Sequence, residues 1–402
     1  MPTRTQVRTW IAGFALLVPS AVMAQDRTER ELLDLIVRDG PRARAIRAET
    51  EVVRREQLAR LAYPNPTLMY SREGAGFTEF LQAEQSLPLF GVRTALARAG
   101  VEATAAAEAE RDARLWVLRA DAAGALARLL AEQERLQTAE SHIGQIERMI
   151  EVLRTREREG EGSRFDRLRS EQELREARQS RAAAAVGVAD ARAAVSALLP
   201  RDTVLGRITA GEVERPIPQH EALMARARAT RAELRALERA ARRAEFEVDA
   251  ARRTRLPSPT VFGGLKRADD IAGREQGGVF GVSLSLPLFD GGGREAARWA
   301  AERARVDFER AAMEEQIRAE ITRASEVAAL RQAALSEDQP GAGDELMRIA
   351  EIAYREGEVG IVELIDAVRT ASRARFRSID IRLEVRLAQL ALERAVGGTL
   401  WP

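Results

Sequence analysis

The chain of 402 residues has no cysteine, a single lysine (Lys266) and only two histidines, His142 and His220. Without cysteine no disulfide can form, so the stability of the fold must come from packing. Two histidines without cysteine are too few for a His/Cys metal site. We therefore expect neither a metal nor a cofactor.

An excess of charge of one sign is also missing. The 63 Lys and Arg residues are balanced by 62 Asp and Glu residues, which leaves a net charge of +1. Nucleic-acid binding needs a one-signed patch, so this function is not expected.

The sequence contains no P-loop, no Gly-x-Ser-x-Gly and no plausible catalytic triad, so we do not expect an enzyme. Three methionines are predicted to be core residues: Met149, Met313 and Met347.

Long hydrophobic runs are absent except near the N-terminus. Arg4 and Arg8 precede an apolar run over residues 11–18, Pro19 interrupts it, and small residues follow up to Ala24. This pattern predicts a Sec-type signal peptide over residues 1–24. The alternative, a membrane anchor, would need about 20 apolar residues, and this run is much shorter. We expect an exported protein without membrane-spanning helices.

The chain contains an internal repeat. The pentamer "SLPLF" occurs at residues 86–90 and again at 285–289. Upstream, "PNPTLMYS" matches "PSPTVFGG"; downstream, "REGEGSRFDRL" matches "REGEVGIVELI". Three matches in the same order indicate a duplication. We therefore predict two repeats, residues 25–200 and 218–398, which are joined by a linker over residues 201–217.

Each repeat is predicted to contain a helix, a β-hairpin and a long helical hairpin. The first helices, residues 27–62 and 220–253, end before Pro-x-Pro. The β-hairpins occupy about 64–90 and 257–289, with strands of about 8–10 residues and a polar loop over 267–278 in the second copy. The long helices run over 92–156 and about 294–355, the latter with an interruption near "SEDQPGAGD", and Gly-containing tips follow near residues 160 and 357. Trp299, Val306 and Met313 are spaced by seven residues, which is typical of a coiled-coil seam.

The strands leave two interpretations open. Phe280, Val282 and Leu284 fall on one face of their strand, whereas Gly281, Ser283 and Ser285 fall on the other. Four strands cannot close a membrane barrel, and open edges are not tolerated in lipid. The strands must therefore either pack on helices in water or combine with the strands of further chains.

These features resemble the TolC-like outer-membrane efflux proteins over essentially the whole mature chain. The most specific stretch is "YREGEVGIVELIDA" at residues 354–367, which is similar to the family signature of the second periplasmic hairpin. The resemblance implies a mainly α-helical homotrimer in the outer membrane, in which four strands from each chain close a 12-stranded barrel. The helices then form a periplasmic tunnel.

The same resemblance implies a passive exit duct of a tripartite efflux or secretion system. Its partners would be a periplasmic adaptor protein and an inner-membrane transporter. The wording "LPLFG" is closest to the metal-efflux and RND-pump members, so an RND transporter is favoured. The rival interpretation is a periplasmic coiled-coil adaptor or scaffold that has no membrane barrel.

The resemblance also implies roles for several residues at the periplasmic end. Glu363 and Asp366 would form a ring of acids at the channel constriction, and Asp166 matches Glu363 in the first repeat. Tyr354 would help to latch the closed end. Val359 replaces the arginine with which the family completes this latch, so we expect other contacts, from Arg158, Arg164 or Arg355.

Two further sets of residues complete the expected site. Gly160 and Gly357 would form the tips that dock on the adaptor, because glycine permits the reversing turn. Pro88 and Pro287 would end the strands, since proline cannot donate to the ladder. Together with Phe90 and Phe289 they would form the joint between barrel and tunnel.

Overall fold

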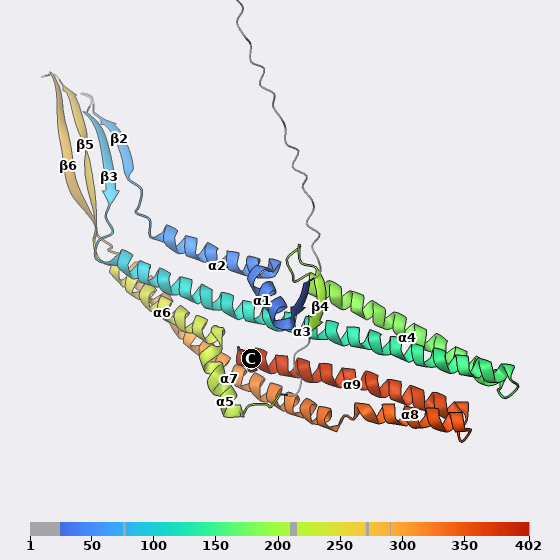
Figure 1. The fold of residues 1–402 in the computed structure, drawn as a ribbon. Helices are drawn as coiled ribbons and strands as arrows, with labels where there is room; N and C mark the ends of the chain where they lie inside the picture. Colours follow the sequence, from blue (N-terminus) through green and yellow to red (C-terminus); the bar gives the residue numbers. More distant parts are fainter. Residues whose placement is uncertain (1–24, 75–77, 210–214, 271–272, 290, 402) are drawn as a thin grey trace, which may run out of the picture.

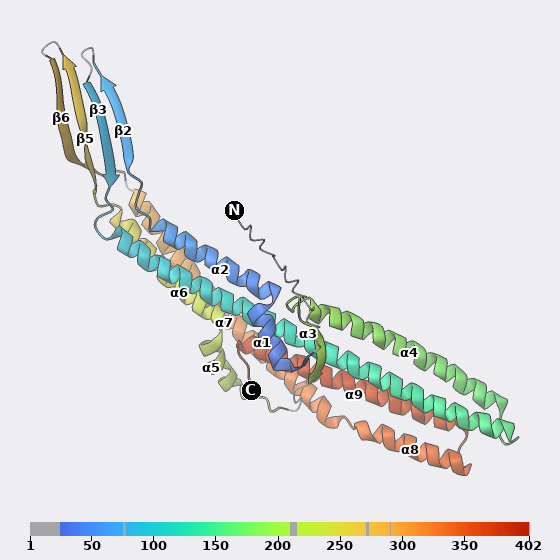
Figure 2. The same cartoon turned by 45° about the horizontal axis from the view of Figure 1, so that its top comes forward.

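The computed structural model describes residues 25–401 except 75–77, 210–214, 271–272 and 290. The predicted signal peptide, residues 1–24, therefore lies outside the described part. A four-stranded sheet forms one end of an elongated molecule, and helices form most of the rest (Figures 1 and 2).

The longest element is helix α3, Val92–Arg158, which has 67 residues. It would measure about 100 Å, and its extent agrees with the predicted 92–156. Its first half buries Ala95, Ala99 and Ala103. α6 (Ala232–Arg253) packs along this half, where Arg239 donates to Glu102 (3.1 Å). Alanines three or four residues apart share one face, and their small side chains let neighbouring helices approach closely.

The other long helices continue this parallel arrangement. α4 (Arg164–Ser196) returns along α3, while α7 (Gly291–Glu337) and α8 (Pro340–Glu356) together form the outgoing arm of the second repeat. α9 (Ile361–Val396) returns along both α7 and α8. The interruption predicted near "SEDQPGAGD" thus lies between α7 and α8.

Of the predicted seam residues, Val306 is buried and Trp299 is half-buried. Further apolar residues of α7 and α9 are also buried: Ile317, Ile365, Val368, Ile379 and Leu390. The three methionines pack against hydrophobic clusters: Met313 against one around Ile321 and Leu392, and Met149 and Met347 against one around Ile146 and Leu364.

The first predicted helix, 27–62, is wrong as a single helix. The chain forms a short strand β1 (Gln25–Thr28), then α1 (Glu29–Asp39) and α2 (Pro41–Arg60). Thr28 and Glu31 form a capping box at the start of α1. Pro41 has no N–H to donate and starts α2, and a Cβ on Gly40 would lie only 2.3 Å from the carbonyl oxygen of Ile36.

The equivalent helix of the second repeat is also divided, into α5 (His220–Thr230) and α6. The prediction of one helix over 220–253 is therefore wrong too. The break lies at Arg231, which has extended backbone angles (φ −63°, ψ 112°). Its buried guanidinium donates to Glu320 Oε2 (2.6 Å), and this long-range ion pair fixes the bend.

Four antiparallel strands form the sheet, in the order β2, β3, β5, β6. β2 is Thr67–Glu73 and β3 is Thr78–Ser86, whereas β5 (Ser258–Asp270) and β6 (Gly273–Ser285) have 13 residues each. The predicted polar loop over 267–278 is therefore wrong, because most of it pairs in the ladder. Backbone hydrogen bonds do not require apolar side chains, and Arg274 also pairs with Asp269 across the hairpin (3.2 Å).

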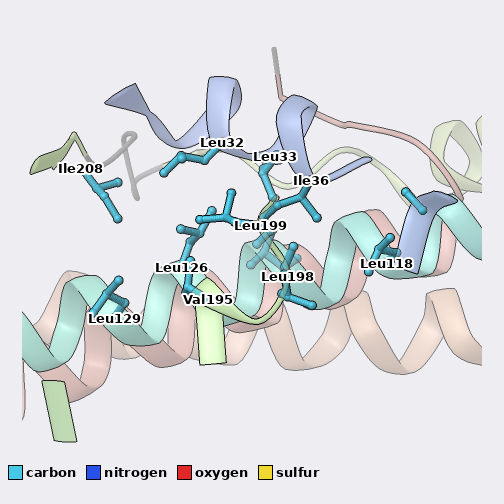
Figure 3. Close-up of a cluster of buried hydrophobic side chains, with 14 residues drawn as sticks. Leu32, Leu33, Ile36, Leu118, Leu126, Leu129, Val195, Leu198, Leu199 and Ile208 are labelled. Atoms are coloured by element: carbon cyan, nitrogen blue, oxygen red, sulfur yellow. The ribbon is translucent and has the colours of Figure 1, made fainter. Parts of the chain in front are cut away.

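A second, two-stranded sheet lies half-way along the molecule. β1 pairs in parallel with β4 (Leu205–Thr209), a strand within the predicted linker that the sequence did not suggest. Beneath it, side chains from α1, α3 and the end of α4 form a hydrophobic cluster that includes Leu33, Leu126 and Leu198 (Figure 3). This cluster joins the beginning of the first repeat to its end.

Within the described residues, none of the helices is both long enough and apolar enough to cross a membrane.

Candidate channel joint and helical tips

The two faces of the four-stranded sheet differ in polarity. The ladder pairs place even residues of β2 and β6 on the same face as odd residues of β3 and β5. This face carries exposed apolar side chains over all four strands: Leu68, Tyr70, Leu81, Val261, Leu265, Phe280, Val282 and Leu284. Phe280 is 89% exposed.

Charged residues occupy the end of this face that is far from the helices. Arg72 lies opposite Glu79 on the neighbouring strand, and Arg267 lies opposite Gln276. The face therefore consists of an apolar band and a charged end. We call the part that carries the eight exposed apolar side chains the apolar band.

The opposite face of the sheet is more polar. It carries Thr67, Ser71, Gln82, Glu84, Thr260, Lys266 and Ser283, together with Met69, Phe80 and Phe262. The ammonium group of Lys266 lies 5.5 Å from the ring centre of Phe80. The outer strands, β2 and β6, each pair on one side only within the described chain, so the sheet has two open edges.

The joint between sheet and helices has the same local structure in both repeats. Leu89 N–H donates to Leu87 O (2.8 Å) around Pro88, and Leu288 N–H donates to Leu286 O (2.9 Å) around Pro287. A hydrogen bond between residues i+2 and i defines a γ-turn. The last ladder bond before Pro88 runs from Leu87 N–H to Pro259 O (2.9 Å).

Phe90 and Gly91 turn the chain into α3. Phe90 has a φ of 60°, which is rare for a residue with a side chain, and Gly91 has a φ of 75°. Arg253 at the end of α6 donates to Phe90 O (3.2 Å). The Phe90 and Phe289 side chains are 52% and 88% exposed, so both lie on the surface of the single chain.

The two helical tips are built alike. Gly160 and Gly357 have φ values of 81° and 78°. Glu161 N–H donates to Arg156 O and Glu358 N–H donates to Ala353 O, both at 2.9 Å, which is the Schellman pattern of helix C-termini. A Cβ at either glycine would meet nothing within 4 Å, so the tips are open to solvent.

The acidic residues follow the same duplication. Asp166 and Glu363 are each the third residue of a returning helix, α4 and α9 respectively. A carboxylate in the first turn stabilises a helix N-terminus. Asp166 is half-buried, whereas Glu363 and Asp366 are exposed on one face of α9.

Tyr354 contacts an arginine that the sequence did not identify. The guanidinium of Arg156, on α3, lies 5.4 Å from the Tyr354 ring centre, on α8. Two of the expected arginines instead bind their own helices: Arg158 donates to Arg154 O (3.3 Å) and Arg355 to Glu351 O (3.3 Å). The cation–π contact therefore joins the two helical hairpins close to their tips.

A buried polar seam connects α3, α4 and α9 above the tips. Arg369 Nε donates to Glu173 Oε2 (2.7 Å), and the Glu173 residue is only 6% exposed. This hydrogen bond raises the pKa of Arg369, and the charges of Glu173, Glu176 and Asp366 add to the effect. The neighbouring His142 is 8% exposed, and its Nδ1 has no partner among the described residues. Burial lowers the pKa of His142.

The sequence model of the outer membrane efflux protein family matches residues 223–398. No curated protein matches the chain closely enough to count as a relative.

Three solved structures share the fold over most of the chain. The open-state outer membrane channel MtrE of Neisseria gonorrhoeae is 21% identical over 92% of this chain and 89% of its own, with a TM-score of 0.73. The outer membrane protein VceC of Vibrio cholerae is 17% identical over 93% and 97%, with a TM-score of 0.69. The outer membrane channel CmeC of Campylobacter jejuni is 13% identical over 92% and 86%, with a TM-score of 0.70. The family match and the shared fold confirm that this chain resembles the TolC-like outer-membrane efflux proteins.

Proposed function

We propose that the protein is the outer-membrane channel of a tripartite efflux or secretion system, active as a homotrimer and as a passive duct. The observation that carries the proposal is the four-stranded sheet, with its apolar band on one face and two open edges. In a trimer the edges β2 and β6 of neighbouring chains would pair, and twelve strands would close a barrel with the apolar band toward lipid.

The exposure of the apolar band favours this arrangement over a water-soluble sheet. Soluble monomers rarely expose contiguous apolar patches larger than a few hundred Å². The sheet extends beyond the ends of the helices, so they do not cover its apolar face (Figures 1 and 2). A periplasmic scaffold would have to leave this face in water.

The periplasmic end fits the docking role that the family implies. The open tips at Gly160 and Gly357 would contact a periplasmic adaptor, and an inner-membrane transporter, of the RND class by the resemblance, would deliver the substrate. Around a three-fold axis Glu363 and Asp366 would form rings of like charge, with Asp166 nearby on the first hairpin. Such rings attract cations and repel anions.

Disulfide crosslinking between neighbouring chains tests the proposal. The natural chain has no cysteine, so introduced cysteines are the only ones that can form a disulfide. Ser71→Cys on β2 would be combined with Val279→Cys or Ser283→Cys on β6, on the same face of the sheet. In purified outer membranes we expect oxidation to give a covalent trimer on denaturing gels. Ser71→Cys with Ser180→Cys, on exposed α4, is the control. Release of the protein with the soluble periplasm, or only intact monomer, would contradict the proposal.

A further inference from the structure

A cavity of about 330 Å³ lies in the middle part of the molecule, away from the sheet and the tips. Its walls come from α1, α3 and α9 and from the C-terminal segment after α9. Small-molecule sites commonly have volumes of about 300–1,000 Å³, so this cavity is large enough for a ligand with one or two aromatic rings.

Two tryptophans give the cavity aromatic walls. Trp401 is held in place because its Nε1–H donates to Pro216 O (3.0 Å). Trp116 also lines the cavity, but its buried Nε1–H has no acceptor in the described part of the chain. A buried donor without a partner is unfavourable, so an acceptor on a ligand would be bound favourably.

The charges around the cavity favour an anion. Four arginines line it: Arg30, Arg119, Arg215 and Arg386. Arg386 pairs with Glu29 (2.7 Å), and Arg119 with Asp34 (2.9 Å). Within the ranges that the structure describes, Arg30 and Arg215 form no ion pair.

Glu393, the remaining acid of the lining, already has partners. Its Oε1 accepts the backbone N–H of Leu400 at 2.9 Å. This bond ties the C-terminal segment to α9 and leaves the carboxylate charged. The four arginines of the lining therefore face two acids, Glu29 and Glu393, and keep an excess of positive charge.

We propose that this cavity binds a flat organic anion, an aromatic carboxylate or sulfonate. Its ring would lie against Trp116 and Trp401, an oxygen would accept the Trp116 N–H, and its charge would face Arg30 and Arg215. A second cavity, of about 540 Å³ beside Arg231, has no aromatic side chain in its lining and serves as the comparison. The site does not depend on the channel function proposed above.

Isothermal titration calorimetry of the full-length protein in detergent tests this site, with 2-naphthoate as the probe. The uncharged 2-naphthylmethanol controls for uptake by detergent. We expect saturable binding of one naphthoate per chain and at least tenfold weaker binding of the alcohol. Bound naphthoate should also raise the Tm, since it would bind only the folded chain.

Single substitutions identify the residues that bind naphthoate. Trp116→Phe keeps an aromatic ring but removes the N–H, and Arg30→Gln removes a charge at an exposed position; each should weaken naphthoate binding at least fivefold. Arg323→Gln, in the lining of the second cavity, should leave it unchanged. If Trp116→Phe does not fold, the naphthoate affinity of Arg30→Gln still tests the proposed site. Equal affinity in all variants, or no saturable heat from the natural chain, would overturn the proposal.

Discussion

At the scale of single residues, a sequence motif predicts which residues lie at the helical tips but not which side chains contact each other there. The sequence identified Tyr354 and both tip glycines, and all three lie near the ends of the hairpins. It did not identify Arg156, because several arginines precede Gly160 and only the packing of α3 beside α8 decides which one reaches the ring. The residue spacing within one helix does not predict which arginine contacts a ring on another helix.

Replacing Tyr354 tests the contact with Arg156. The cation–π interaction requires an aromatic face and not the hydroxyl, so Tyr354→Phe should leave single-channel conductance in planar bilayers unchanged. Tyr354→Leu and Arg156→Gln should each weaken the join between the hairpins by about 0.5–1 kcal/mol and increase conductance. An effect of Tyr354→Phe as large as that of Tyr354→Leu would show that the hydroxyl carries the contact.

His142 predicts a pH dependence of stability. Burial lowers its pKa in the folded chain, Glu173 on α4 acts in the opposite direction, and Arg375 and Arg369 on α9 lower it further. The unfolded chain, with an imidazole pKa of about 6.5, therefore binds the proton more readily than the folded chain. The contribution of neutral His142 is present above this pKa and is lost as the pH falls below it.

We expect His142→Leu to reduce the loss of Tm between pH 7.5 and pH 5.5. His220→Leu, at the exposed start of α5, is the matched control and should behave like the natural chain. Identical pH profiles for the natural protein and His142→Leu would contradict this role of the buried imidazole.

At the scale of elements, the extents of the long helices could be predicted from the sequence, whereas the breaks in the first helix of each repeat could not. The long helix α3 and the order of the hairpins follow from residues near each other in the sequence. The break at Arg231 does not, because a distant acid, Glu320, and the C-terminal end of α9 hold the bend. β1 and β4 were not predictable for the same reason, because each strand forms only by pairing with the other across the whole first repeat.

Gly264 tests the contact between the two hairpins. A Cβ at this position in β5 would lie 2.2 Å from the carbonyl oxygen of Leu81 and 2.8 Å from the Cα of Gln82, both on β3. Gly264→Ala should therefore force the strands apart and destabilise the sheet by about 1–3 kcal/mol. Gly277→Ala in β6, where a Cβ meets nothing within 4 Å, is the control.

Thermal dissociation of the detergent-solubilised protein would measure the difference. Gly264→Ala should dissociate at a clearly lower temperature than Gly277→Ala. Equal temperatures would mean that β3 and β5 are not packed as closely as in this structure.

At the scale of the whole molecule, the duplication explains why the two tips are similar in backbone but different in charge. Asp166 and Glu363 occupy the same helical position, yet Arg169 stands where the second repeat has Asp366. A trimer would thus present six tips of two alternating kinds. A trimer can be proposed only by combining the strand count with the resemblance, since nothing in one chain fixes the copy number.

Neutralising the second-repeat acids should alter ion selectivity. Glu363→Gln combined with Asp366→Asn should reduce the preference for cations over anions, measured as a shift of reversal potential in a salt gradient. Glu358→Gln, another exposed acid at the same tip, is the control and should change the potential less. An unchanged potential in the double variant would show that these residues do not line the narrow part of the channel.

The position of Lys266 has a practical consequence. It is the only lysine, and it stands beside Phe80 on the polar face of the sheet. An amine-reactive reagent would therefore modify each chain at this side chain and at the terminal amine alone. In the proposed trimer the three modified side chains would lie within the pore, so a bulky label should obstruct current without any engineered residue.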